Sequence, residues 1–434
     1  MSPEVGFVGI AVLIVLLLLR VPVAMALIAV SFGGITALLG VTPAFGILSN
    51  TPYSFVASWT MSAVPMFLLM GFVAFHTGLT GGLFAAAKVV LRRLPGGLAV
   101  SSIFACSGFA AVSGSSLACA AAMGRIAIPE MIAAGYRPSI AAGTIAAGGT
   151  IGALIPPSIL MIIYGVFAET SVTQVFIGGI GIGVITAIGY CLVIIGISLF
   201  RPDLVPARDT APVSEEGRAA ILQVVPITVL VLLIFGGMFS GLFTATEAGA
   251  VGALGTIVLA AVTGRLTKSS VTHSLIDTVT STGALFIIGV GAAMFTRFLG
   301  ISGLSHFLSS FVADADLGYF ELMLIIVLIY LALGTFMEPF GAMLTTLPIF
   351  LPILRAEGIS LVWFGVVVVK MLEIGMITPP VGMNVFVIKN VAGKYVSIAQ
   401  VFAGVLPFIV MDLFVIALVI AVPSVVMFLP DLLR

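Results

Sequence analysis

Charge is what this sequence has least of. Only 8% of its 434 residues are Asp, Glu, Lys or Arg and 61% are hydrophobic, whereas a soluble domain is about 25% charged and about 45–50% apolar. Four long stretches carry no formal charge at all, at residues 21–87, 138–168, 170–200 and 219–246. Because about 20 such residues cross a bilayer, the composition excludes an ordinary soluble protein and predicts an all-α integral membrane protein in contact with lipid.

The sequence also has no excess of basic over acidic residues, and it has few cysteines and histidines. Seventeen Lys and Arg balance seventeen Asp and Glu, so no basic surface is present for a nucleic acid. Cys106, Cys119 and Cys191 lack CxxC spacing and are interpreted as small packing residues. The three histidines lack ligand spacing, so we expect neither a zinc-type metal site nor a cofactor. The start, "MSPEVGFVGI", has no basic segment and is not expected to be a cleaved signal peptide.

Charged residues and Pro/Gly clusters divide the chain into ten predicted crossings. These are residues 5–19, 21–39, 62–75, 138–168, 172–200, 220–239, 245–263, 278–295, 361–391 and 398–428. Residues 96–123 and 321–354 are set aside, because the arms of the first region, about 15 residues each, reach only about 22 Å of a ~30 Å core. We predict re-entrant hairpin units at about 96–133 and 318–355, with a single tilted span as the alternative for each.

The basic residues predict an orientation. With the N-terminus outside, the inner loops hold thirteen of the seventeen basic residues, as the positive-inside rule requires. We therefore expect a periplasmic N-terminus, with the first hairpin opening to the cytoplasm and the second to the outside.

The chain also repeats itself. A shift of 223 residues places Pro156 and Pro157 on Pro379 and Pro380, and the tip "SGSS" (113–116) on the tip "FMEP" (336–339). A polar linker at 201–218 separates residues 1–200 from 219–434, and each half has five crossings, one hairpin and one broken helix, at 138–168 and 361–391. An odd number of crossings makes the two repeats inverted. Inverted repeats with broken helices indicate a secondary transporter whose site lies near mid-membrane.

The breaks and tips supply the candidate site. Proline and glycine free backbone carbonyls inside each broken helix, and carbonyls freed at that depth must line a cavity or bind a cation. The candidate substrate and ion ligands are Ser113, Gly114, Ser115, Ser116, Gly149, Thr150, Gly152, Pro156, Glu338, Gly341, Thr345, Gly375, Thr378, Pro379 and Asn384. We expect Na⁺ near Ser113, Ser115, Gly149 and Gly152, and again near Gly341, Gly375 and Thr378.

Structural alternatives exist for each group of candidates. The prolines can form simple kinks, and the small residues of the first tip can serve close helix packing. Glu338, an acid inside the membrane, is a functional candidate by default, but it can also make a structural hydrogen bond. Asn384 can hold either substrate or backbone.

We expect structural roles for the other polar residues inside the predicted helices. Lys370 and Glu373 lie three apart on one predicted helix and are expected to neutralise each other. Arg297 and Asp412 are each expected to pair with some other residue within the bundle. "AVSGSS" is similar to the motif of intramembrane serine proteases, but Ala111 stands where that motif has glycine, and no histidine is expected at matching depth. An open channel is a further alternative, which two opposed hairpins disfavour.

Four segments together resemble a known family. They are "AAVSGSSLACAAAMGRIAIPEM", "AAGGTIGALIPPSILMIIYG", "EPFGAMLTTLPIFLPIL" and "EIGMITPPVGMNVFV", and they resemble the large membrane subunit (DctM-like) of tripartite ATP-independent periplasmic (TRAP) transporters. The resemblance implies an elevator-type transporter of the ion-transporter superfamily in a bacterial inner membrane. Its cation and substrate region maps to 113–116 with 149–152, and to 338–341 with 375–379.

The resemblance also implies a transport cycle and partners. It implies import of an organic acid anion, such as a C4-dicarboxylate, sialic acid or keto acid, with Na⁺ as the coupling ion. It further implies a separate small four-helix membrane subunit and a periplasmic solute-binding protein. The alternative is a stand-alone sodium/dicarboxylate symporter of the same superfamily.

Overall fold

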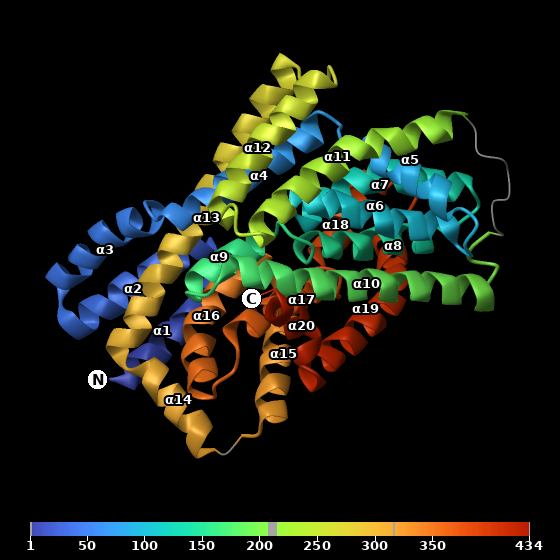
Figure 1. Cartoon of the computed structure of the whole chain (residues 1–434). Helices are drawn as coiled ribbons and strands as arrows, with labels where there is room; N and C mark the ends of the chain where they lie inside the picture. The colour runs from blue at the N-terminus through green and yellow to red at the C-terminus, as the bar shows by residue number, and fades with distance from the viewer. Residues whose placement is uncertain (1, 207–214, 316, 434) are drawn as a thin grey trace.

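The computed structural model describes residues 2–206, 215–315 and 317–433, and every regular element within them is helical. Figure 1 shows the helices of the whole chain. In the first half they are α1 (Pro3–Leu18), α2 (Val23–Leu39), α3 (Val41–Val56), η1 (Trp59–Ser62), α4 (Ala63–His76), α5 (Gly81–Leu91), α6 (Gly97–Ser113), α7 (Ser116–Ala133), α8 (Pro138–Thr150), η2 (Ile151–Ala153), α9 (Ile159–Phe167) and α10 (Val172–Phe200).

The second half continues this order of helices. It contains α11 (Glu215–Phe239), α12 (Ala245–Val262), α13 (Lys268–Ser302), α14 (Leu304–Asp314), α15 (Tyr319–Phe336), α16 (Pro339–Ala356), α17 (Leu361–Gly375), α18 (Met383–Ala392), α19 (Ile398–Ala421) and α20 (Ser424–Leu432). Residues 207–214, the centre of the predicted 201–218 linker, lie outside the described residues.

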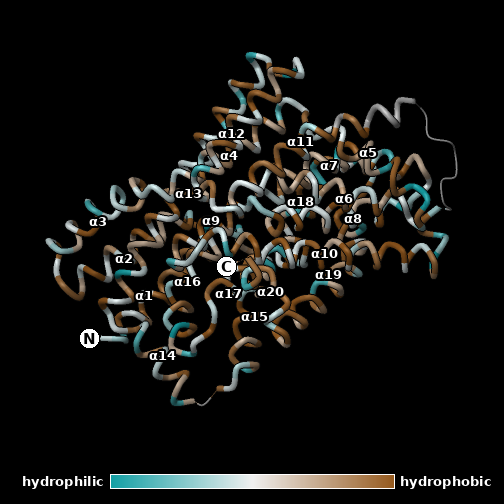
Figure 2. The backbone as a smooth tube through the Cα atoms, viewed as in Figure 1, coloured by the Kyte–Doolittle hydropathy of each residue, from teal (hydrophilic) through white to brown (hydrophobic). Residues whose placement is uncertain are grey.

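The helices have the composition of a membrane protein, as predicted. Eight of those described are long and apolar enough to cross a bilayer, judged by length and composition: η1 with α4 as one continuous stretch, and α7, α10, α12, α13, α15, α16 and α19. Apolar residues run along nearly every helix in Figure 2. Large aliphatic and aromatic side chains remain exposed along α1, α10 and α11, where a bilayer is the medium that covers such surface.

Several helix limits differ from the predicted ones. The segment predicted at 278–295 is part of the 35-residue α13, because Asp277 and the polar residues before it continue the helix. The segment predicted at 398–428 ends at Ala421, and α20 begins after Pro423. Helices α3, α5 and α14 were not predicted; they have 16, 11 and 11 residues, which is short for a spanning helix.

Two helix–turn–helix units contain the predicted tips. In the first, α6 ends at Ser113 and Gly114 turns the chain with φ +60° before α7. In the second, α15 and α16 are joined by Met337 and Glu338 in extended conformation. The arms of the first hairpin, expected to have about 15 residues each, are longer, with 17 residues in α6 and 18 in α7; α15 and α16 also have 18 residues each, or about 27 Å. Arg125 lies within α7 and does not end it.

The helices before each hairpin pack across the two halves of the chain. α4 packs against α12 and α13, α2 against α13, and α5 against α11. In Figure 1 α4, α12 and α13 run side by side. The hairpins also pack on the broken helices, α7 on α8 and α18, and α15 and α16 on α17, while α6 packs on α5 and α16 packs more extensively on α13 and α14. The two groups meet where α4 contacts α6 and α9, and where α2 and α13 contact α16.

Candidate functional site

The first hairpin tip is a tight turn fitted to the first broken helix. At Gly114 a side chain would meet the carbonyl oxygen of Pro157, and the positive φ favours glycine there as well. Ser115 caps α7, its hydroxyl accepting a hydrogen bond from the Ala118 amide at 3.4 Å. The hydroxyls of Ser113 and Ser116 are buried and have no hydrogen-bond partner among the described residues. The tip therefore presents two free oxygen ligands.

The first break lies directly behind this tip. α8 ends at Thr150, η2 follows, and Pro156 precedes Pro157 in a cis peptide. A Cβ at Gly152 would lie 3.0 Å from the backbone of Ser115 and Ser116, and one at Gly149 would lie 3.2 Å from the Ser116 carbonyl oxygen. Glycines let the two backbones approach, so the structure brings Ser115 and Gly152 of the first predicted cation set together, with Gly149 beside Ser116.

The second tip is capped by its own acid. Glu338 is the N-cap of α16 and accepts a hydrogen bond from the Gly341 amide at 3.1 Å. The Thr345 hydroxyl donates to the Gly341 carbonyl at 2.7 Å. Gly341 itself faces Val23 of α2. Glu338 thus has a structural hydrogen bond of the kind that the sequence left open.

The second break packs on an arm of its hairpin. A Cβ at Gly375 would lie 2.5 Å from the Gly334 backbone of α15. The Thr378 hydroxyl donates to the Ile374 carbonyl, and the backbone N–H of Asn384 donates to the Met376 carbonyl across the break. Pro379 is exposed, whereas Pro156 is buried. These contacts do not gather Gly341, Gly375 and Thr378 at one point.

Asn384 joins the two breaks. Its Nδ2 donates to the Ala146 carbonyl of α8 at 3.3 Å and lies close to Gly149, whereas its buried Oδ1 has no partner among the described residues. Asn384 therefore holds backbone with one end and leaves an oxygen free at the other.

A cavity of about 590 Å³ lies between the two tips. Of the predicted residues it is lined by Ser113, Gly114, Ser115, Ser116 and Glu338. The other predicted residues are not in its wall: Gly149, Thr150, Gly152, Pro156, Gly341, Thr345, Gly375, Thr378, Pro379 and Asn384. The cavity is closed on other sides by α2, α4, α9, α13 and α17, so elements of both halves surround it.

The expected pairing of Lys370 with Glu373 is wrong. Lys370 Nζ lies 2.5 Å from Asp412 Oδ1, and Tyr190 donates to the other oxygen of Asp412 at 2.7 Å. The Tyr190 hydroxyl also lies 3.1 Å from Thr150 Oγ1 at the first break. The lysine points toward Tyr190 on α10 and Asp412 on α19. Asp412 therefore pairs within the bundle, as predicted.

Glu373 is the functional candidate that the sequence reasoning missed. Its side chain lines the cavity, is 1% exposed, and has no hydrogen-bond partner for either carboxylate oxygen among the described residues. An unpaired acid inside the membrane is by itself a signal for function. Lys370, one turn away on the same helix, hides that signal in the sequence because it is an equally good partner by spacing.

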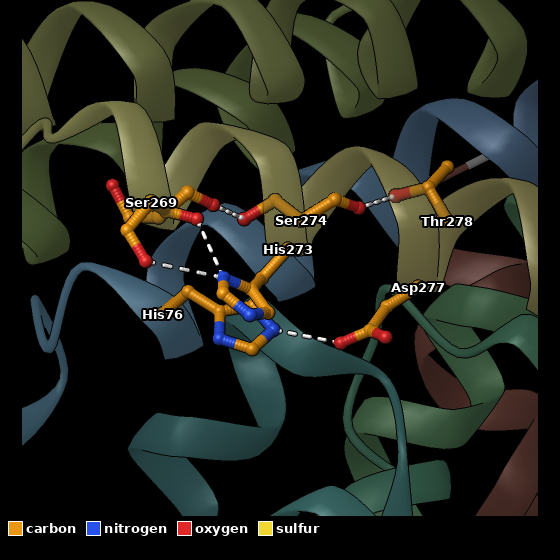
Figure 3. A network of polar contacts seen from close by, with 7 residues as sticks. His76, Ser269, His273, Ser274, Asp277 and Thr278 are labelled. Carbon is orange, nitrogen blue, oxygen red and sulfur yellow. Dashed lines mark hydrogen bonds and ion pairs between the residues drawn. The ribbon is translucent and has the colours of Figure 1, made fainter.

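Arg297 and the histidines lie away from the cavity. The expected pairing of Arg297 within the bundle is wrong, because Arg297 is exposed on α13 and no ion pair joins it to any residue within the described ranges. His76 Nε2 lies 2.7 Å from Asp277 Oδ2, joining α4 to α13, with His273 beside it (Figure 3). No histidine occurs among the described residues that line the cavity, so the tip serines lack the base that a serine protease needs.

Comparison with known proteins decides the family. Residues 10–425 match the model of the tripartite ATP-independent periplasmic transporter, DctM component. This chain belongs to the DctM family. The C4-dicarboxylate TRAP transporter large permease protein DctM of Pseudomonas aeruginosa is 34% identical over 374 residues, covering 86% of each chain. The ectoine/5-hydroxyectoine large permease UehC of Ruegeria pomeroyi is 32% identical, covering 97% of each chain.

A fused relative bears on the subunit organisation. The isethionate TRAP transporter permease DctMQ of Oleidesulfovibrio alaskensis is 31% identical over 417 residues, which cover 95% of this chain and 64% of that longer protein. DctM proteins are transporter permeases, not enzymes, and they work with a small membrane subunit, separate or fused, and a periplasmic binding protein.

Solved transporters share the fold. The Alcanivorax borkumensis YdaH transporter aligns with a TM-score of 0.63 at 18% identity, covering 89% of this chain and 90% of its own. Neisseria gonorrhoeae MtrF aligns with a TM-score of 0.64 at 16% identity, covering 89% and 85%. At these identities the likeness extends to the fold alone.

Proposed function

We propose that this chain is the large permease subunit of a transporter that imports an organic acid with Na⁺ across the bacterial inner membrane. The observation that supports this best is a cavity lined by both hairpin tips, with both broken helices contributing wall residues. A site shared by two discontinuous regions near mid-membrane is typical of secondary transporters built from inverted repeats. The substrate is bound there between the tips.

The first tip and break supply the main cation site. Ser113, Ser116 and the backbone around Gly149 and Gly152 present oxygen atoms and no sulfur or imidazole, which favours a hard cation over a transition metal. The two buried hydroxyls fit a cation site. A hydroxyl that is buried without a hydrogen-bond partner costs free energy, and a bound cation supplies the missing partner. Na⁺ at this tip also links the hairpin to the broken helix that Asn384 ties to the second half.

Transport follows an elevator movement in this proposal. The hairpins and broken helices contact one another, and they meet α2, α4 and α13 around the cavity, with α16 packed closely on α13. They slide as one body against that frame, with the N-terminus on the periplasmic side. The small subunit is a separate polypeptide, and a binding protein delivers the substrate.

The substrate class is proposed from the relatives only at the level of an organic acid. Their names include C4-dicarboxylate, isethionate and ectoine, so carboxylates and other compact organic acids are the compounds to screen. The alternative is a stand-alone sodium/dicarboxylate symporter, which differs in needing no partner.

The decisive experiment is reconstitution into vesicles with an inward Na⁺ gradient. We expect the isolated chain to be inactive, and uptake to require the small subunit, the substrate-loaded binding protein and Na⁺ together. Robust uptake by the isolated chain favours the stand-alone symporter. Uptake by the complete system without a sodium requirement contradicts the proposal that Na⁺ is the coupling ion.

A further inference from the structure

The described wall of the cavity carries acidic side chains and aromatic rings but no basic side chain. Glu338 and Glu373 are its ionisable residues, and Lys, Arg and His are absent from the described residues that line it. Apart from the proposed Na⁺ at the first tip, a simple organic anion placed there meets two carboxyl groups and no positively charged side chain. This charge pattern predicts an occupant with a positive group.

The two acids are not equivalent. Glu338 already accepts the Gly341 amide at the start of α16, which uses the positive end of that helix. Glu373 has no such partner for either oxygen, although it is 1% exposed. Its helical neighbour Lys370 is held by Asp412 at 2.5 Å. Since an unpaired buried charge is costly, Glu373 is the acid that an incoming cation satisfies.

The anionic end of an occupant has a different place. α7 is capped by the neutral Ser115, so the positive end of its 18 residues is not neutralised by an acid of its own. The Ser113 and Ser116 hydroxyls at that end are the proposed Na⁺ ligands, so a carboxylate at the start of α7 lies beside the bound Na⁺ as well as at the helix end, and Ser116 lies next to Glu373. A site for a carboxylate and a site for a cation are therefore adjacent.

The surroundings favour an organic cation over a second inorganic one. Phe72, Phe75 and Phe340 line the same cavity, and aromatic faces recognise ammonium groups through cation–π attraction. The apolar side chains of Leu68, Leu285 and Ile288 complete a wall poor in the converging oxygens that a small metal ion needs. The volume of about 590 Å³ also lies within the range of pockets that hold small organic molecules, roughly 300–1,000 Å³.

We infer that Glu373 binds a cationic nitrogen group of the substrate, and that the transported acid is a compact zwitterion, its carboxylate at the start of α7 and its ammonium or amidinium group at Glu373. This rests on the proposed function, because it places the substrate in the cavity between the tips.

The test is direct binding to the purified full chain in detergent with Na⁺, using pairs of probes that differ in the positive nitrogen. The pairs are glycine betaine against 3,3-dimethylbutanoate, L-proline against cyclopentanecarboxylate, and a cyclic amidinium carboxylate against its cyclohexene analogue. We expect at least one zwitterion to bind ten-fold or more tightly than its isostere, measured as a ligand-dependent thermal shift. Equal binding within every pair, or binding by none of them, overturns the inference without any variant.

Variants assign the effect to one residue. Glu373→Gln should bring the preferred zwitterion to the affinity of its isostere, Glu373→Asp should keep part of the preference, and Glu130→Gln, an acid that pairs with Lys88 away from the cavity, should keep all of it. Stabilisation by Na⁺ alone should survive in Glu373→Gln. If Glu373→Gln instead loses the Na⁺ effect and keeps the preference, Glu373 is an inorganic cation ligand and the inference is wrong.

Failure of this inference is separable from failure of the proposed function. Sodium-dependent binding or transport of nitrogen-free anions leaves the organic-acid permease intact and removes only the zwitterion. Loss of sodium dependence in the complete transporter removes the proposed coupling, whichever probe binds.

Discussion

Lys370 and Asp412 form a buried ion pair inside the helix bundle. Their charged atoms lie 2.5 Å apart, and their side chains are 1% and 0% exposed. The pair joins α17, which carries the second break, to α19, and Tyr190 extends it to Thr150 at the first break. Four helices from both halves of the chain are thus connected by one buried polar network. Such a network is costly to interrupt on one side only.

We therefore expect Asp412→Asn to destabilise the fold strongly. The change leaves the Lys370 ammonium buried without its carboxylate, which typically costs about 3–5 kcal/mol. Thermal unfolding of the detergent-purified protein measures it. The matched control is the double variant Lys370→Met/Asp412→Leu, which removes both charges and should unfold close to the wild type. If the double variant is as unstable as the single one, the network stabilises the fold through more than charge pairing.

The His76–Asp277 contact should behave in the opposite way. Its two side chains are 22% and 44% exposed although the atoms lie 2.7 Å apart (Figure 3). Because half-exposed pairs are worth about 0–1 kcal/mol and are screened by salt, Asp277→Asn should lower the melting temperature little, and less at high salt. A loss comparable to that of Asp412→Asn would show that this link between α4 and α13 is desolvated in the bilayer.

The contrast between local and distant features explains what the sequence predicted. The breaks at Pro156 and Pro379 and the turn at Gly114 follow from backbone chemistry that is local to a few residues, so their positions were readable. The partner of Lys370 was not, because Asp412 is 42 residues away and the rotation of α17 decides which acid the lysine meets. The same rotation directs Glu373 into the cavity. Helix limits were missed where polar residues, as at Asp277, continue a helix and do not end it.

Gly375 should be required for close packing and not for flexibility alone. A methyl group there would lie 2.5 Å from the Gly334 backbone, and overpacking of this kind typically costs about 1–3 kcal/mol. We expect Gly375→Ala to lower both the melting temperature and uptake by the complete transporter. Gly283→Ala, on α13 with nothing near the added methyl group, should be neutral or slightly stabilising, since alanine favours helix by about 1 kcal/mol. Equal behaviour of the two variants contradicts the packing argument.

Ser113 offers a cleaner test of the sodium site than Ser115. The Ser115 hydroxyl caps α7, so its removal also weakens a helix, whereas the Ser113 hydroxyl has no partner to lose among the described residues. Removing one ligand of hydrogen-bond strength costs about 1–2 kcal/mol, so Ser113→Ala should raise the Na⁺ concentration for half-maximal uptake roughly ten-fold. Ser107→Ala on the same helix, whose hydroxyl bonds to Ile103, is the control. An unchanged sodium dependence places the ion elsewhere.

The elevator movement can be tested at one contact between the frame and the second hairpin. A Cβ at Gly341 of α16 would lie 3.7 Å from the Cβ of Val23 on α2, which is within the 3.5–4.5 Å range of disulfides. Val23→Cys/Gly341→Cys should therefore cross-link readily, and oxidation should stop uptake while reduction restores it.

The control cross-link lies within the body that is proposed to move. Gly124 of α7 and Val391 of α18 approach closely, a Cβ at Gly124 lying 3.4 Å from Val391 Cγ1. Oxidised Gly124→Cys/Val391→Cys should transport normally, because both residues travel together. The single variants correct for any effect of the substitutions themselves. If the Val23–Gly341 cross-link forms completely and uptake continues, α2 and the second hairpin do not separate during transport, and the elevator movement is excluded.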